Sequence, residues 1–102
     1  MSTFVRLFAT AVDPADTGNV HRLFTDDVRD AFERLPGCIG VELLMSTHHS
    51  AGGLVEMLTL SRWGSLEEME SALASRDVKE AMVRILPLFH QEPVVRVFEK
   101  TG

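Results

Sequence analysis

The segment from Leu54 to Trp63 constrains the fold more than any other part of the sequence. It reads Leu-Val-Glu-Met-Leu-Thr-Leu-Ser-Arg-Trp, a run rich in strand-forming residues that predicts one long β-strand. It continues directly into Gly64-Ser65-Leu66-Glu67-Glu68, where a serine precedes a glutamate by three positions, the spacing of a helix capping box. The only tryptophan of the chain therefore lies where a sheet meets a helix.

Three further strands and two helical regions are predicted around this segment. Asp13 and Pro14 are typical of a helix start, as N-cap and first helical residue, and Pro36-Gly37 ends that helix. Asp77 is expected to cap a second helical segment that ends near Pro87. The predicted strands cover residues 3–12, 38–45, 54–63 and 93–99, and residues 46–53 form a hairpin loop.

The predicted order is β-α-β-β-α-β, in two similar halves. This order is typical of an α+β ferredoxin-like sandwich, in which helices cover one face of a four-stranded antiparallel sheet. A chain of 102 residues is the length of one domain, so residues 1–102 are expected to fold as a single unit.

Composition argues against several classes of partner and site. The net charge is −5 and the ten Lys and Arg residues are scattered, which disfavours binding to nucleic acid or to an anionic membrane. Cys38 is the single cysteine, so neither an internal disulfide nor a cysteine-based metal site is expected. We find neither a secretory signal nor a membrane-spanning run, and we expect a soluble cytoplasmic protein.

Strand parity divides the predicted sheet into two faces. The face assigned to the helices holds Val5, Leu7, Ala9, Ile39, Val41, Leu43, Val55, Met57, Thr59, Ser61, Trp63, Val95 and Val97. The opposite face holds Phe4, Arg6, Phe8, Glu42, Leu44, Glu56, Leu58, Leu60, Val94, Arg96 and Phe98. Apolar residues among a few opposite charges indicate a surface covered by a second copy of the chain. We therefore expect a homodimer through this face, with Arg6 or Arg96 paired to Glu42 or Glu56.

The residues with chemical potential are few. Thr59 and Trp63 are unusual for a helix-covered face and could line a cavity, although Trp63 could equally be a core residue whose indole N–H finds a carbonyl. His90 follows the last helical segment and could point into such a cavity as a base. His48 and His49 are adjacent on an extended chain, so their side chains point apart and we predict no metal site.

Two segments give the chain a family resemblance: Leu35-Pro36-Gly37-Cys38-Ile39-Gly40 after the first helix, and Trp63-Gly64-Ser65-Leu66-Glu67-Glu68-Met69 after the third strand. With them, the whole chain resembles the antibiotic biosynthesis monooxygenase family of dimeric α+β barrels. The resemblance implies a homodimeric barrel. It also implies cofactor-independent oxygenation of a small aromatic substrate, such as a phenol or hydroquinone, in a pocket between sheet and helices.

The resemblance also implies site residues. In the quinone-forming oxygenases of this family a pocket tryptophan corresponds to Trp63, while Thr59 and Met69 stand where those enzymes have asparagine and tyrosine. Arg84 could match a pocket arginine on the last helix. The candidate catalytic residues are thus Trp63, His90 and Arg84, and the candidate substrate-binding residues are Trp63, Thr59, Met69, Phe32 and Phe24.

Two alternative functions remain open at this point. The exchanged asparagine and the lack of any tyrosine favour a non-catalytic dimeric domain that binds a small ligand or a protein. A haem-binding or haem-degrading protein of the same superfamily would need an asparagine on the first strand, a tryptophan in the second helical region and a histidine further along that region. The chain has Arg6 or Leu7 in place of the asparagine, Ala72 in place of the tryptophan, and Met82 or Val83 in place of the histidine. These residues disfavour haem binding.

Overall fold

The computed structural model describes residues 2–49 and 52–101 and has the predicted order of elements. The strands are β1 (Thr3–Val12), β2 (Cys38–His49), β3 (Val55–Trp63) and β4 (Val94–Lys100). The first helical region comprises η1 (Pro14–Asp16), α1 (Thr17–Leu23), η2 (Phe24–Val28) and α2 (Arg29–Glu33). The second comprises α3 (Leu66–Leu73), α4 (Arg76–Ile85) and η3 (Leu86–Leu88).

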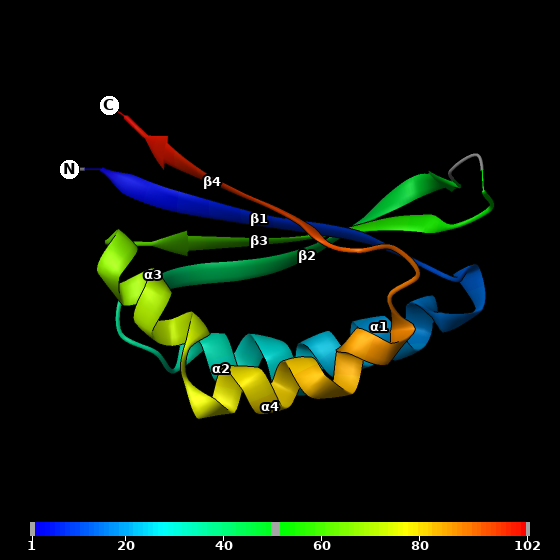
Figure 1. Cartoon of the computed structure of the whole chain (residues 1–102), viewed down its shortest axis with the longest axis horizontal. Helices are drawn as coiled ribbons and strands as arrows, with labels where there is room; N and C mark the ends of the chain where they lie inside the picture. Colours follow the sequence, from blue (N-terminus) through cyan, green and yellow to red (C-terminus); the bar gives the residue numbers. More distant parts are fainter. Residues whose placement is uncertain (1, 50–51, 102) are drawn as a thin grey trace.

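The four strands form one antiparallel sheet in the order β2-β3-β1-β4. Figure 1 shows both helical regions as a layer on one side of this sheet. The ferredoxin-like α+β fold is therefore confirmed. No helix among the described residues is long and apolar enough to cross a lipid bilayer.

Helix starts follow the capping pattern of the sequence, with one exception. The Asp13 carboxylate accepts a hydrogen bond from the Ala15 amide at 2.8 Å, and the Ser65 hydroxyl accepts one from the Glu68 amide at 3.1 Å. The predicted cap at Asp77 is wrong. The cap is Ser75, two residues earlier, and α4 begins at Arg76. The Ser75 hydroxyl accepts a hydrogen bond from the Val78 amide at 3.3 Å.

The hairpin between β2 and β3 is longer than the sequence pattern indicates. β2 continues to His49, which pairs with Val55 across a bulge, so the loop predicted from residue 46 is wrong over residues 46–49. Polar residues can remain in a strand here because residues 46–49 are all exposed to solvent. Residues 50 and 51 of the predicted loop lie outside the described part of the chain.

The first helical region is not one continuous α-helix. Its middle segment, η2, is a π-helix, a wider turn that inserts a residue into the helix and is frequent at functional sites. η2 directs Phe24 and Val28 into the protein interior. The same segment carries Asp27, which faces α4 on the outer side.

The face assignment of β1 made from the sequence is wrong. Phe4 pairs with Trp63 and Phe8 pairs with Thr59, and directly opposed residues of antiparallel strands point to the same side. Phe4, Arg6 and Phe8 therefore belong to the helix-covered face, while Val5, Leu7 and Ala9 belong to the open face. The residues of β1 that point to either face are largely apolar, so the alternation of polar and apolar residues did not show which set faces the helices.

The open face of the sheet is consequently more apolar than expected. It is formed by Val5, Leu7, Ala9, Glu42, Leu44, Glu56, Leu58, Leu60, Arg62, Val94, Arg96 and Phe98. Its one ion pair joins Arg62 to Glu42, and Arg6, expected to pair with Glu42 or Glu56 here, lies on the other side. Ile39 was assigned to the helix side but lies in a bulge and is exposed.

Candidate functional site

A narrow apolar slot lies between the helix-covered side of β1 and β3 and the helices. Its volume is about 20 Å³, room for one water molecule at most. We call it the slot. It is lined by Arg6, Phe8, Phe24, Val28, Phe32, Met57, Thr59, Met82, Ile85 and Phe89.

A wider groove adjoins the slot beside α4. Its volume is about 460 Å³, and it is lined by Arg6, Phe32, Leu73, Val78, Lys79, Met82, Val83 and Leu86. Arg6, Phe32 and Met82 line both spaces. These three side chains therefore form the boundary through which a ligand would pass from the groove into the slot.

Among the described residues that line the slot, Arg6 is the only ionisable one. Its guanidinium carbon lies 5.5 Å from the centre of the Phe8 ring, within the range of a cation–π contact. Burial lowers the pKa of Arg6, because the charged form loses water contacts. Among the described residues five other arginines form ion pairs with carboxylates and Arg6 forms none.

Thr59 is the second polar residue of the slot. It lies directly opposite Phe8 on β1 and opposite Leu43 on β2, so its hydroxyl stands on the helix-covered side among hydrocarbon groups. Within residues 2–49 and 52–101, the slot thus offers a ligand one hydroxyl, one cation and a largely aromatic wall.

Trp63 lies outside the lining of both spaces. Its side chain is 0% exposed, its indole N–H donates to the Ser61 hydroxyl at 2.9 Å, and its ring meets the edge of Phe32 at a centroid distance of 5.9 Å. Met69 is likewise buried in the core. Trp63 and Met69 thus line neither the slot nor the groove, and Trp63 packs against Phe32, which lines both.

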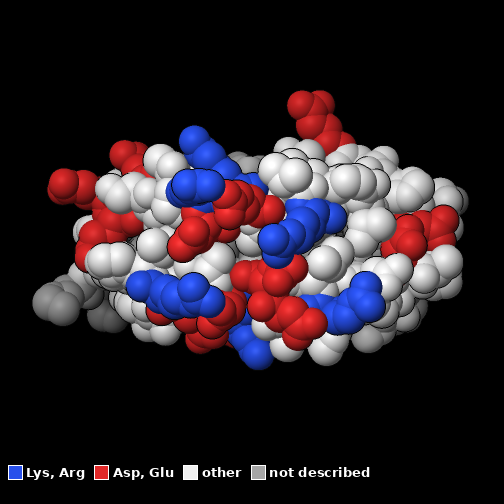
Figure 2. All heavy atoms as spheres, turned by 90° about the horizontal axis from the view of Figure 1, so that it is seen from below, with Lys and Arg blue, Asp and Glu red and all other residues white. Residues whose placement is uncertain are grey.

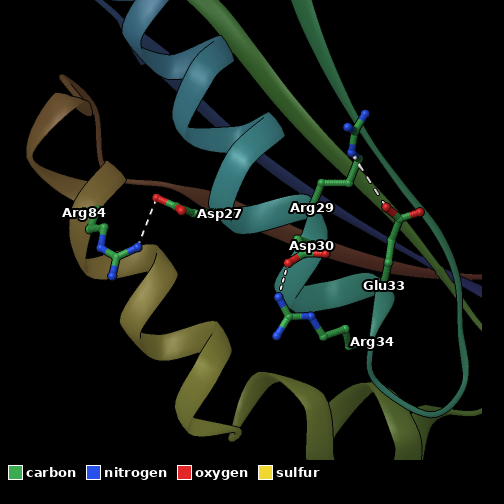
Figure 3. Close-up of polar contacts among 6 residues, drawn as sticks. All are labelled: Asp27, Arg29, Asp30, Glu33, Arg34 and Arg84. Carbon is green, nitrogen blue, oxygen red and sulfur yellow. Dashed lines mark hydrogen bonds and ion pairs between the residues drawn. The ribbon is translucent and has the colours of Figure 1, made fainter.

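The two other candidate catalytic residues lie at the surface. Arg84 is on the outer side of α4 and pairs with Asp27 of η2 at 3.1 Å, as Figure 3 shows. His90 is exposed, and its backbone N–H donates to the Ala11 carbonyl at 2.8 Å. The structure thus brings Phe24, Phe32 and Thr59 together in the slot and leaves both polar candidates outside it.

The outer surface of the helix layer carries both acidic and basic side chains. Figure 2 shows acidic and basic side chains interleaved over this face. Neighbouring ion pairs within the first helical region join Arg29 to Glu33 and Arg34 to Asp30 (Figure 3). Such exposed pairs compensate each other and contribute little to stability, so this face has the properties of an ordinary solvated surface.

Arg6, Phe8 and Met82 are the site residues that the sequence reasoning missed. The register of β1 against β3 would have identified the first two, because Phe8 stands opposite the candidate Thr59. Met82 of α4 lines both spaces, and from the sequence it was considered only as the position where a haem protein would need a histidine. As for metals, the described residues contain no cluster of three His, Cys, Asp or Glu side chains that could bind an ion.

Comparisons with known proteins agree with this architecture. The family model described as antibiotic biosynthesis monooxygenase matches residues 3–84. A search of curated proteins finds no significant match. A Bordetella bronchiseptica structure that carries the family's name superposes with a TM-score of 0.79 at 20% identity and covers 100% of both chains.

Two more solved structures show the same fold. One, from Caulobacter crescentus and also bearing the family's name, has a TM-score of 0.78 at 19% identity and covers 99% of this chain and 92% of its own. Rv0793 from Mycobacterium tuberculosis has a TM-score of 0.73 at 15% identity and covers 98% and 96%. At such identities the structures support the fold alone. The family match over most of the length shows that this chain belongs to the antibiotic biosynthesis monooxygenase family.

Proposed function

We propose that the chain is a monooxygenase that oxidises a small planar aromatic substrate in the slot without a metal or organic cofactor. The observation that carries this proposal is the lining of the slot. Four phenylalanine rings surround the space, those of Phe8, Phe24, Phe32 and Phe89, and within the described lining only Arg6 and Thr59 have polar side chains. Aromatic rings favour such surroundings, and a few fixed polar groups orient them.

The chemistry expected of such a site balances without an added reductant. One atom of dioxygen becomes a new carbonyl oxygen on the ring, and the other leaves as water with two hydrogens of the substrate. An anthrone loses both hydrogens from its ring methylene, whereas an electron-rich phenol loses one from a ring C–H and one from its O–H and becomes a quinone. The substrate supplies all the electrons. The protein would contribute exclusion of water and a fixed orientation of the ring.

Substrate entry requires the slot to widen. Met82 lies at the boundary with the groove and is only half-buried, and methionine side chains change rotamer readily. Displacement of Met82 towards the groove would join the two spaces. The groove is large enough for one aromatic ring system.

The test is oxygen uptake by dialysed protein with a panel of electron-rich phenols and anthrones. We expect uptake by the natural chain, loss of uptake in Met82→Trp, which fills the boundary, and retained uptake in Trp63→Phe, which changes a core ring behind it. Absence of uptake across the panel would refute the oxygenase. Uptake lost only in Trp63→Phe would place the substrate elsewhere.

A second candidate function is ligand binding without turnover. It is favoured by the absence, among the described slot residues, of any side chain that accepts a proton near neutral pH: arginine stays protonated and threonine is a hydroxyl. Calorimetric binding of phenols in the absence of oxygen uptake would support this function over the first.

We also propose a homodimer formed through the open face of the sheet. Phe98 is 49% exposed and Leu44 is 45% exposed on that face, beside Leu7, Leu58 and Leu60. An apolar face of this kind is uncommon on a monomer, and a two-fold axis allows it to bind its own copy. Light scattering at micromolar protein concentration should give twice the mass of the chain, and a monomer would contradict the proposal.

A further inference from the structure

We propose that the slot binds its aromatic ligand as an oxyanion, an ionised phenol, and that Arg6 is the charge partner of that oxygen. This inference rests on the proposed use of the slot as the ligand site. It adds the ionisation state of the ligand and names the residue that recognises it.

The charges around the slot and the groove are all of one sign. The chain has 15 acidic and 10 basic residues, yet the described side chains that line the two spaces include Arg6 and Lys79 and no carboxylate. By contrast, the hollow between η2 and α4 on the outer side is lined by both signs, which form their own ion pairs. In a net acidic chain, the described lining of the slot and the groove thus carries positive charge alone.

Arg6 lacks the compensation that the other enclosed polar groups have. The buried Thr10 hydroxyl donates to the Gln91 carbonyl at 2.7 Å, and the Trp63 indole N–H donates to Ser61. Arg6 has only the face of Phe8, and no ion pair in the part of the chain described involves it. Arg6 is partly buried, and partial loss of water around a guanidinium without an anion is unfavourable. A phenolate oxygen would supply the missing partner.

A cation at Arg6 would also explain how a phenol can lose its proton in a slot whose described lining has no basic side chain to accept it. A cation within about 4–6 Å lowers the pKa of an acidic group by about 1–3. A phenol whose oxygen lies at Arg6 would therefore release its proton to solvent on binding. The protein would not need to accept that proton, which agrees with a described slot lining that has no histidine or carboxylate.

Umbelliferone provides the direct test, because its neutral and ionised forms absorb at different wavelengths. Its methyl ether has nearly the same shape and cannot ionise. With the natural chain we expect the ether to bind, and bound umbelliferone to ionise at a pH about 1–3 lower than free umbelliferone. In Arg6→Met, which keeps an unbranched apolar side chain, this shift should vanish and affinity for the ionised form should fall about ten- to hundredfold. Affinity for the ether should stay.

Arg84→Met is the matched control, because it removes an arginine from the outer side of α4 and should leave the titration of bound umbelliferone unchanged. Arg6→Lys keeps a cation and should retain part of the shift, which guards against a fold defect in Arg6→Met.

Three results would overturn the inference. If the ether binds but bound umbelliferone titrates as in water, the oxyanion is wrong while the slot remains a ligand site. If the shift survives in Arg6→Met, or if that variant changes only the oligomeric state, Arg6 is not the partner. If neither compound binds the natural chain at millimolar concentration, both the oxyanion and the proposed site fail.

Discussion

Replacing Gly37 by alanine is expected to lower the free energy of unfolding by about 2–5 kcal/mol. The backbone of Gly37 has a φ of 83°, a left-handed conformation that costs a residue with a β-carbon about 1–2 kcal/mol. The new β-carbon would lie 2.6 Å from Cβ and 2.5 Å from Cδ of Glu68. Overpacking of this kind adds about 1–3 kcal/mol. Rotation of the Glu68 side chain removes only part of the clash, because its Cβ is fixed to α3.

Gly53→Ala is the matched control for this variant. Gly53 has a φ of 78°, but a β-carbon there would meet no atom within 4 Å, so its loss should be limited to about 1–2 kcal/mol. The assay is urea unfolding of both variants and the natural chain at one protomer concentration, because a dimer makes stability depend on concentration. We expect Gly37→Ala to be less stable than Gly53→Ala by about 1–3 kcal/mol. Equal losses would show that Glu68 does not restrict Gly37.

Three further predictions concern the core, the thiol and the open face. Ser61→Ala should cost about 1–3 kcal/mol in urea unfolding, because the buried Trp63 indole N–H loses its acceptor; an unchanged midpoint would argue that another acceptor replaces it. Burial raises the pKa of the Cys38 thiol, so less thiolate is present at a given pH. The pH–rate profile of its alkylation by iodoacetamide should therefore have its inflection at a higher pH than that of a free cysteine, and an inflection at the same pH would contradict this. Leu58→Lys on the open face should convert the proposed dimer to a monomer in light scattering, whereas Leu66→Lys on α3 should not. Identical behaviour of both variants would count against the sheet-face dimer.

Local signals in the sequence were sufficient to predict the elements of the fold. Ser65 and Glu68 identified the start of α3, and Asp13 identified the start of the first helical region, because capping depends on residues close in sequence. The π-helical turn at η2 was not predictable in this way. Its residues, Phe-Thr-Asp-Asp-Val, continue the same helical spacing, whereas the segment that η2 packs against, α4, lies about fifty residues further along the chain.

The sequence analysis missed Arg6 and Phe8 because it assigned the two faces of β1 the wrong way round. A charged residue on a strand is normally assigned to solvent, and this placed Arg6 on the open face. Arginine can, however, lie with its alkyl stem on apolar surface, and here it lies beside Phe8 under the helices. Because the central strand β1 is apolar on both sides, only its partner residues on β3 fix its faces. The pairing of β1 with β3 joins residues far apart in the sequence, so it cannot be predicted from the spacing of residues within β1.

The two segments that carry the family resemblance meet at one joint of the fold. Gly64 donates its backbone N–H to the Gly37 carbonyl at 2.9 Å, Cys38 pairs with Trp63, and the missing side chain of Gly37 leaves room for Glu68. These three contacts depend on the path of the backbone, and they do not depend on which ligand is bound.

None of these joint residues lines the slot. Conversely, Arg6, Thr59 and Met82 line the slot and take no part in this joint. The joint therefore accounts for the architecture, whereas the ligand that we propose for the slot would be selected by side chains that the recognisable motifs do not include. Two members of this family could share the joint residue for residue and still bind different molecules, and it is substitutions at the boundary of slot and groove that would distinguish them.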